Sequence, residues 1–260
     1  INTMKTKHLI ILSFCILFTF NACQNLTDIL PTELTEAEIV DGLKSALTVG
    51  ADSSVANTSK VNGYLQDEVI KLLLPTEAQG VITSLRSSIA GESIYQYSIK
   101  TLEDSVITSL NRSAEDAAVL AKPILINAIT NITIADGKKI LFDGIDTAAT
   151  NYLRINTFSS LKTAFSPKID ASLNKALFAR FSANYYWSAF TTGYNTVANS
   201  PANFLLNLKP LKTQSLGSYA TERALEGLFV KIKAEEISIR KDPTARVTDI
   251  LVKVFGKLDK

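Results

Sequence analysis

Near the C-terminus, charged residues gather around an Asp-Pro step in a pattern that could bind a polar ligand or perform acid–base chemistry. The members of this cluster are Glu235, Glu236, Arg240, Asp242 and Arg246, with Arg154 from an earlier segment as a candidate to join them in space. A pair of carboxylates can work as acid and base, and carboxylates beside arginines can hold a polar molecule. Adjacent residues diverge by about 100° around an α-helix, however, so Glu235 and Glu236 are a poor template for the facing pair of a glycosidase. We therefore favour an ion-pair network that fixes the angle between two helices.

Two predicted helices position this cluster. Glu236 lies on the apolar stripe of the first helix, so we expect its carboxylate to be buried and paired with Arg240 or with an arginine from another helix. Asp242 is predicted to cap the second helix, with Pro243 in its first turn and Gly256 at its end. The stripes follow three- and four-residue spacing: Leu225, Leu228, Phe229, Ile232 and Ile239 in the first helix, and Val247, Ile250, Leu251, Val254 and Phe255 in the second.

A second candidate site is the aromatic-rich segment Phe178–Tyr194, which contains the single tryptophan of the chain. Stacked rings could line an apolar pocket for a lipid, a quinone-like molecule or a sugar. The structural alternative is core packing, which such clusters serve more often. The candidate pocket residues are Tyr185, Tyr186, Trp187 and Phe190.

A third candidate is a polar stripe formed by Asp146, Thr150 and Arg154, which are spaced four apart, considered together with Asn111 and Arg112. It could be a polar binding face, but a solvated helix face or an interhelical hydrogen-bond layer is the favoured interpretation. The sequence contains neither of the glycine-rich loops that hold phosphates or dinucleotides.

The N-terminal residues have the features of a bacterial lipoprotein signal. We interpret residues 1–22 as upstream read-through followed by a signal peptide, because a short basic region precedes the apolar run Leu9–Phe20. That run has the length of a signal core and is too short to be a comfortable membrane span. Ala22-Cys23 resembles the end of a lipobox, so we predict lipidation of Cys23 and a tether over residues 23–34.

Loss of the signal would remove most nucleophilic and metal-binding chemistry. His8 is the only histidine and Cys15 the only other cysteine, so the mature chain would have no histidine and no free thiol. Ser-His-Asp triads, Cys-His pairs, the usual zinc sites and an internal disulfide are thereby excluded, and we expect neither a metal nor a cofactor. Mature charge would be balanced, because removal of two lysines from 27 basic residues leaves 25 against 25 acidic ones. No basic patch stands out, so nucleic acid is not an expected partner.

Residues 35–260 are predicted to form one all-α domain, a globular helical bundle of about eight to ten helices. No run shows the period-two alternation of a strand, and no heptad is sustained as in a coiled coil. We expect Ser166-Pro167 to end one helix and begin another, Glu92–Leu120 to form a long helix, and Asn195–Gly217 to pass outside the bundle.

Several motifs resemble one bacterial family. They are GLF, EE, IR, DP, R-x-T-D-I-L and VFG in the C-terminal stretch, GLKSALTVGA at Gly42–Ala51, NRSAEDAA at Asn111–Ala118, AKPI at Ala121–Ile124 and GIDTAATNYLR at Gly144–Arg154. Together they resemble the domain-of-unknown-function family 4197, and the similarity runs from Thr35 to Gly256. The resemblance implies a helical, envelope-associated protein and lends it no activity.

Three functions remain open at a lipid-anchored, periplasm-facing position in a bacterial envelope, where the membrane itself is a partner. The first is a non-enzymatic binding or interaction module for an apolar small molecule or an envelope protein. The second is a hydrolase that uses Glu235 or Glu236, and the third is a structural assembly factor. An enclosed pocket beside Trp187 would favour the first, convergent carboxylates in a cleft the second, and a flat apolar patch the third.

Overall fold

The computed structural model describes residues 35–178, 181–201, 203–206, 208–211 and 215–256. The predicted signal peptide, the predicted lipidation of Cys23 and the predicted tether all fall outside these residues. From Glu36 onward the chain forms one compact unit. Within the described ranges, none of the helices is both long and apolar enough to span a bilayer.

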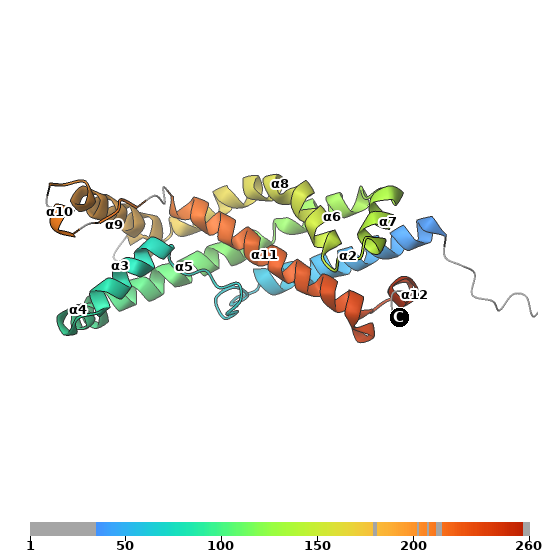
Figure 1. Cartoon of the computed structure of the whole chain (residues 1–260), viewed down its shortest axis with the longest axis horizontal. Helices are drawn as coiled ribbons and strands as arrows, with labels where there is room; N and C mark the ends of the chain where they lie inside the picture. The colour runs from blue at the N-terminus through green and yellow to red at the C-terminus, as the bar shows by residue number, and fades with distance from the viewer. Residues whose placement is uncertain (1–34, 179–180, 202, 207, 212–214, 257–260) are drawn as a thin grey trace, which may run out of the picture. The chain divides into compact units, whose positions relative to one another are not determined.

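Helices account for most of the described residues, which confirms the all-α prediction (Figure 1). Their bounds are α2 (Glu36–Ser59), α3 (Thr76–Arg86), α4 (Ile89–Ile94), α5 (Lys100–Ala118), α6 (Ala121–Thr130), α7 (Ile134–Phe142), α8 (Ala148–Leu173), α9 (Ala183–Ala198), α10 (Asn203–Leu206), α11 (Leu216–Lys241) and α12 (Asp249–Phe255). One antiparallel hairpin, β1 (Ala176–Phe178) and β2 (Phe181–Ser182), interrupts them between α8 and α9. Its strands are too short for period-two alternation to reveal them in the sequence.

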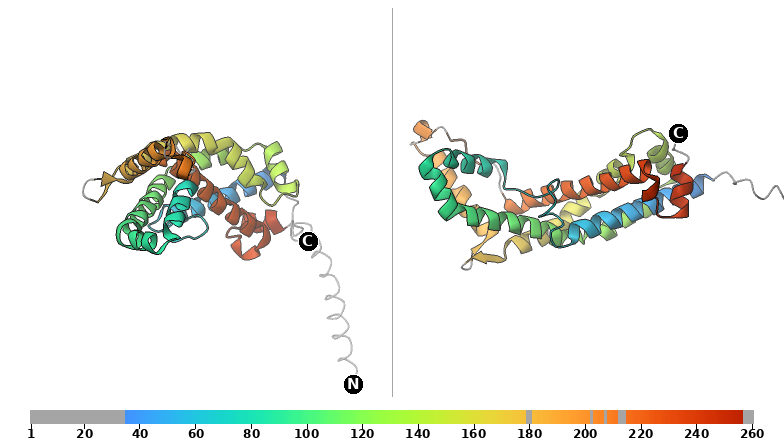
Figure 2. Two further views of the ribbon diagram at one scale, coloured as in Figure 1. Left: turned by 60° about the vertical axis from the view of Figure 1, so that its left-hand side comes forward. Right: turned by 90° about the horizontal axis from the view of Figure 1, so that it is seen from below.

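The centre of the unit is the pair α8 and α11, which run antiparallel. Near the start of α8, Thr150 meets Glu236 towards the end of α11, and near the end of α8, Asp170 lies against Gly217 at the start of α11. Helices α5 and α2 pack along this pair, as Figure 2 shows. The core between them consists of fully buried apolar side chains that follow helical spacing: Leu43, Leu110, Ala114, Leu153, Leu161, Phe165, Ile169, Leu225 and Leu228.

Glycine lets the C-terminal helix approach the first helix closely. A Cβ built on Gly42 of α2 would lie 2.5 Å from the side chain of Val254 in α12, so any larger residue would push α12 away. Leu251, Val254 and Phe255 bury the predicted apolar face of α12, whereas Val247 is 67% exposed and precedes the helix.

Two predicted boundaries were wrong. Pro167 lies inside α8 instead of starting a new helix, because Phe165 and Ile169 are fully buried on either side and their packing outweighs one lost backbone hydrogen bond. Asp242 caps a short 3-10 turn, η3 (Pro243–Ala245), by accepting a hydrogen bond from Thr244 N. Helix α12 is capped instead by Thr248, whose hydroxyl accepts a hydrogen bond from Leu251 N.

The remaining boundaries are closer to prediction. The expected long helix over Glu92–Leu120 is continuous but contains a π-helical turn, η2 (Tyr95–Ile99), between α4 and α5. The connection expected over Asn195–Gly217 is shorter, because α9 continues to Ala198 and α10 follows it. Figure 1 shows α3, α4, α9 and α10 gathered at one end of this unit and α7 and α12 at the other.

Candidate functional site

The predicted charged cluster contains a buried junction between helices, which we call the Glu236 junction. The carboxylate of Glu236 accepts hydrogen bonds from the backbone N–H groups of Ala149 at 3.0 Å and Thr150 at 2.7 Å, and from the Thr150 hydroxyl at 2.7 Å. Arg240 donates to the same carboxylate from Nε at 3.0 Å and from a terminal nitrogen at 2.9 Å. The side chains of Glu236 and Arg240 are only 5% and 8% exposed, so the predicted buried pair is confirmed.

Glu236 caps a helix that lies far from it in sequence. The N-cap residue of α8, Thr147, makes no side-chain hydrogen bond to the first turn, and the Glu236 carboxylate takes that role. A negative charge is favoured at a helix N-terminus, where the N–H groups have no helical partner. Arg240 also donates to the carbonyl of Ile140 near the end of α7, at 2.9 Å. The junction therefore joins α11 to both α7 and α8.

This geometry leaves the Glu236 carboxylate little capacity for catalysis. One oxygen accepts hydrogen bonds from Ala149 and Arg240 and the other accepts two from Thr150, so both are occupied by protein donors. The adjacent cavity measures only about 10 Å³, which is no more than a single water needs. The arrangement supports the structural interpretation of this cluster.

The other predicted members of the cluster are arranged around the end of α11. Arg246 is 6% exposed and donates to the carbonyls of Ile239 at 3.1 Å and Arg240 at 3.0 Å, which satisfies orphan acceptors at the helix end. Hydrogen bonds from the side chain and backbone of Thr244 hold the pKa of Asp242 below its usual value. Arg154 does not join this arrangement in the structure; its guanidinium lies over the rings of Phe158 and Phe229, 5.2 and 5.5 Å from their centroids.

Glu235 points in a different direction from Glu236, as the helical spacing requires. Ser53 of α2 donates a hydrogen bond of 2.7 Å to it, and both Glu235 and Asp67 line an open polar cleft of about 460 Å³. Burial of Asp67 opposes ionisation, but hydrogen bonds from Lys231 and from Val69 N–H outweigh it and lower the pKa of the carboxyl. An acid–base pair of carboxylates needs one member with a raised pKa. The lowered pKa of Asp67 does not supply it.

The structure separates the predicted polar stripe into unrelated contacts. Asp146 pairs with Lys241 at 2.5 Å on the exposed side of the Glu236 junction, while Thr150 takes part in the junction itself. Asn111 lies elsewhere, where its side-chain oxygen accepts from Leu72 N and its amide donates to Leu72 O, both at 2.8 Å.

Beside Asn111 on α5, Arg112 and Glu115 form a second hydrogen-bond network, and Glu115 is the member that sequence reasoning missed. Glu115 of α5 accepts hydrogen bonds from the backbone N–H groups of Tyr64 and Leu65 and pairs with Arg112, which in turn donates to Asn62. These contacts order the irregular segment between α2 and α3. Glu115 lies four residues after Asn111 on an alanine-rich buried face, and that position in the sequence was the available signal for a buried carboxylate.

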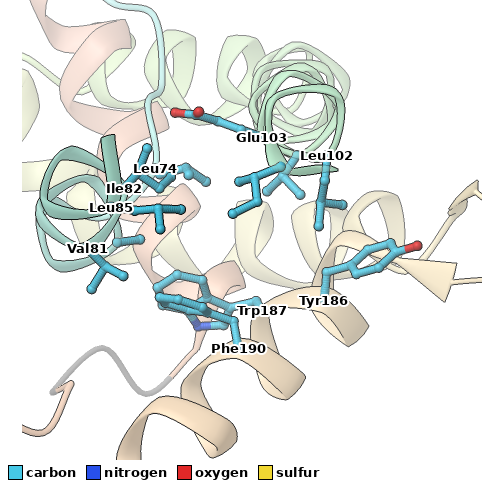
Figure 3. Close-up of a pocket in the computed structure, with 12 residues that line it drawn as sticks. Leu74, Val81, Ile82, Leu85, Leu102, Glu103, Tyr186, Trp187 and Phe190 are labelled. Carbon is cyan, nitrogen blue, oxygen red and sulfur yellow. The ribbon is translucent and has the colours of Figure 1, made fainter. Parts of the chain in front are cut away.

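The aromatic segment lines an apolar space, which we call the Trp187 cavity (Figure 3). Its volume is about 230 Å³, and it lies among α3, η2, α5 and α9. Trp187 is 7% exposed and stands beside Phe190, with ring centroids 5.8 Å apart. The full lining is Leu74, Ala78, Val81, Ile82, Leu85, Ile99, Leu102, Glu103, Val106, Tyr186, Trp187 and Phe190.

Of the four aromatic residues predicted to form a pocket, three line the cavity and one does not. Tyr185 is 49% exposed and stacks on Phe181 with ring centroids 4.2 Å apart. Figure 3 shows the ring of Tyr186 extending sideways from the cavity, and the Glu103 carboxylate turned away from Trp187. Glu103 accepts a hydrogen bond of 2.9 Å from the hydroxyl of Tyr95, so the cavity wall nearest Trp187 is apolar.

Helix α3 supplies the lining residues that sequence reasoning missed. Ala78, Val81, Ile82 and Leu85 repeat at three- and four-residue spacing, which signals an apolar face but not the partner it faces. Among them Val81, Ile82 and Leu85 are only half-buried, so solvent reaches the cavity past α3. The buried indole N–H of Trp187 has no hydrogen-bond acceptor among the described residues.

Neither region resembles a metal site. In the ranges that the structure describes, no group of three or more His, Cys, Asp or Glu residues is arranged to hold an ion.

A family model described as "Protein of unknown function (DUF4197)" matches residues 33–256. Neither a curated protein nor a solved structure matches the chain.

Proposed function

The chain belongs to the DUF4197 family, and we propose that it is a non-catalytic binding protein for an apolar small molecule, held at a bacterial envelope membrane by lipid on Cys23. The observation that carries the binding role is the Trp187 cavity. Cavities of this kind are rare in well-packed protein interiors, because apolar side chains gain contacts by filling such space. A space that is left open and lined by apolar groups is the usual form of a small-molecule site.

The size of the cavity is sufficient for a ligand. An apolar cavity of about 150 Å³ stays dry and binds benzene in another protein. The Trp187 cavity, at about 230 Å³, has room for a ring or for a folded segment of an acyl chain. Its half-buried aliphatic residues on α3 and α5 provide a route of entry that requires no unfolding.

The two alternatives have weaker support. A carboxylate-dependent hydrolase would need a free acid–base pair, whereas Glu236 is fully hydrogen-bonded and the pKa of Asp67 is lowered. A structural assembly factor would need a flat apolar surface and no cavity, and it would gain nothing from the open space beside Trp187.

Intrinsic fluorescence tests the binding role, because Trp187 is the only tryptophan in the sequence. Native mass spectrometry of protein purified from its own host should first reveal any retained molecule. A brominated fatty acid should then quench Trp187 as it enters the cavity. Ala78→Leu adds methyl groups inside the cavity and should weaken binding roughly tenfold or more.

Ala37→Leu is the matched control, since Ala37 lies exposed on α2 and does not line the cavity. It should bind like the unmodified protein. Equal quenching in the Ala78→Leu variant and the control would refute the proposed site, and so would the absence of any quenching in the unmodified protein.

A further inference from the structure

Two stretches of sequence beside the Trp187 cavity carry almost no charge. Residues 181–208, which contain α9 and α10, include no Asp, Glu, Lys or Arg. Residues 78–99, which contain most of α3 and all of α4 and η2, include only Arg86 and Glu92, and Arg86 Nε pairs with a Glu92 carboxylate oxygen at 2.8 Å. Charged residues make up 20% of the whole chain, so this composition is unusual within it. Figure 1 shows the helices of both stretches at one end of the folded unit, which we call the charge-poor end.

The charge-poor end exposes large apolar side chains. Ile89 of α4 is 92% exposed, Tyr97 of η2 is 91% exposed and Phe204 of α10 is 83% exposed. On a soluble protein, exposed apolar side chains usually stand singly among charged residues of both signs and need no explanation. Apart from the Arg86–Glu92 pair, the polar residues of both stretches are neutral, chiefly Ser, Thr, Asn and Gln. This combination of exposed apolar groups and missing charge marks the end as a surface for an apolar partner.

The composition fits the boundary between the head groups and the acyl chains of a bilayer. Transfer of a charged side chain into an apolar environment is costly, and a stretch with no charge avoids that cost. Tyrosine is enriched at the membrane–water boundary, where its ring meets apolar groups and its hydroxyl meets polar ones. Exposed aliphatic and aromatic side chains leave water when they enter this layer, so association strengthens with the apolar area that is buried.

The position of the Trp187 cavity points to the same partner. Trp187 and Phe190 belong to the stretch without charge, and α3 supplies the half-buried residues past which solvent reaches the cavity. An apolar ligand concentrates in bilayers because its transfer out of water is favourable. A cavity that opens beside a bilayer can therefore fill directly from it. The predicted tether over residues 23–34 has a reach of at most about 40 Å, which keeps the membrane close to the folded unit, so a weak contact is sufficient.

From these observations we infer, on the basis of the binding role and the lipid anchor proposed above, that the charge-poor end docks on the membrane surface and that the apolar ligand enters the Trp187 cavity from the bilayer. Ile89, Tyr97 and Phe204 make the contact with lipid. Since the contact does not involve charge, it forms on zwitterionic bilayers as well as on anionic ones. It is too weak to hold the protein through a wash without lipid on Cys23.

Sedimentation with phosphatidylcholine vesicles tests the docking surface. The full chain carries Cys23→Ser, so that no covalent lipid holds it, and the vesicles are in excess and are not washed, because a contact of this kind is readily reversed. Part of the protein should sediment with the vesicles. That part should be the same at low and at high salt, because salt screens charge attraction and leaves apolar contacts in place.

Substitutions at the charge-poor end should weaken this association. Ile89→Ser should weaken it about three- to tenfold, and Ile89→Ser combined with Tyr97→Ser roughly tenfold or more, because each change removes apolar area from the contact. Both side chains are almost fully exposed, and Ser has a helix propensity close to those of Ile and Tyr, so the melting temperature should be unchanged. Ile155→Ser is the matched control, since Ile155 is 82% exposed on α8, outside the charge-poor end. It should sediment like the protein that carries Cys23→Ser alone.

Delivery of the ligand is measured with the same variants. Brominated fatty acid supplied in phosphatidylcholine vesicles should quench Trp187 more slowly in the Ile89→Ser, Tyr97→Ser protein than in the Ile155→Ser control. The same acid supplied in lipid-free buffer should quench both alike, because neither set of changes lines the cavity.

The outcomes separate this inference from the proposed function. The inference is wrong if Ile89→Ser and Ile155→Ser sediment alike, if the protein binds only anionic vesicles and leaves them at high salt, or if it binds no vesicles. Equal quenching rates from vesicles would likewise show that the ligand does not enter through this contact. Quenching in lipid-free buffer reports on the cavity alone, so the binding role stands or falls independently of the docking surface.

Discussion

Replacement of Glu236 by glutamine should be among the most destabilising polar substitutions in this protein. The change removes the buried partner of Arg240, whose side chain is 8% exposed, and places an amide NH₂ group among the N–H donors of α8. Removing one partner of a buried ion pair typically costs about 3–5 kcal/mol, and we expect a value in that range.

Arg240→Gln should cost less, about 2–3 kcal/mol, because the stranded charge remains compensated. After that change Glu236 keeps its hydrogen bonds from Ala149 and Thr150, and its carboxylate still lies at the N-terminus of α8. In the Glu236→Gln variant Arg240 keeps its bond to the carbonyl of Ile140 and can reach a neutral amide oxygen, but its buried charge has lost its anionic partner. The structure therefore predicts an order of effects as well as a size.

Urea denaturation of the two single variants and the double variant measures both quantities. The double-mutant cycle should give a coupling energy of about 1–3 kcal/mol. Lys241→Gln is the internal control, because its pair with Asp146 lies at the same junction with side chains 61% and 53% exposed. Loss of this solvent-exposed pair should change the free energy of unfolding far less than either substitution in the buried pair. Near-zero coupling, or a larger cost for Arg240→Gln than for Glu236→Gln, would refute the reasoning.

Three further outcomes are expected. Cys23→Ser should release the protein from membranes into a soluble fraction, since the several chains of a bacterial lipoprotein anchor firmly; retention after a high-salt wash would contradict the lipid anchor. EDTA should leave the melting temperature unchanged, and a fall of several degrees would reveal a metal. Hydrogen bonds from the side chain and backbone of Thr133 lower the pKa of Asp136 in the folded protein. The ionised carboxyl therefore stabilises the fold at pH values above its unfolded pKa of about 3.9, and this stabilisation is lost as the pH falls through the lowered pKa of the folded state. Asp136→Ala should accordingly cost about 0.5–1 kcal/mol at pH 7 and less near pH 2, as measured by denaturation at both pH values.

Local patterns in the sequence were sufficient to predict most of the helices and some of the residues at which they begin or end. The apolar stripe of α11 placed Glu236 on a buried face and Arg240 within reach of it, because both statements depend only on helical spacing. The capping box of α7 depends on the same kind of local spacing, since Thr133 and its partner Asp136 are three residues apart.

Contacts between distant segments could not be predicted in this way. Nothing near Glu236 in the sequence indicates that its partner is the first turn of α8, 86 residues earlier. The Trp187 cavity depends on the distance between α3 and α9. The spacing of apolar residues within either helix gives no information about that distance. The prediction at Pro167 was wrong because the rule that proline interrupts a helix considers the backbone alone. Buried side chains along the whole length of α8 stabilise the helix on both sides of the proline.

The position of α11 in the chain has a consequence for the order of folding. The hydroxyl of Tyr64 donates to the carbonyl of Ala224, 160 residues later, and Ser53 donates to Glu235, 182 residues later. To form contacts at such separations, the chain must first close large loops, and the conformational entropy lost in closing them is offset only after the contacts have formed. Folding is slower as a result. While the ribosome is still adding residues before Leu216, α2, α8 and the segment around Tyr64 have no α11 to pack against. A chain with this layout emerges from synthesis as an incomplete bundle, and completion is deferred until its last long helix arrives.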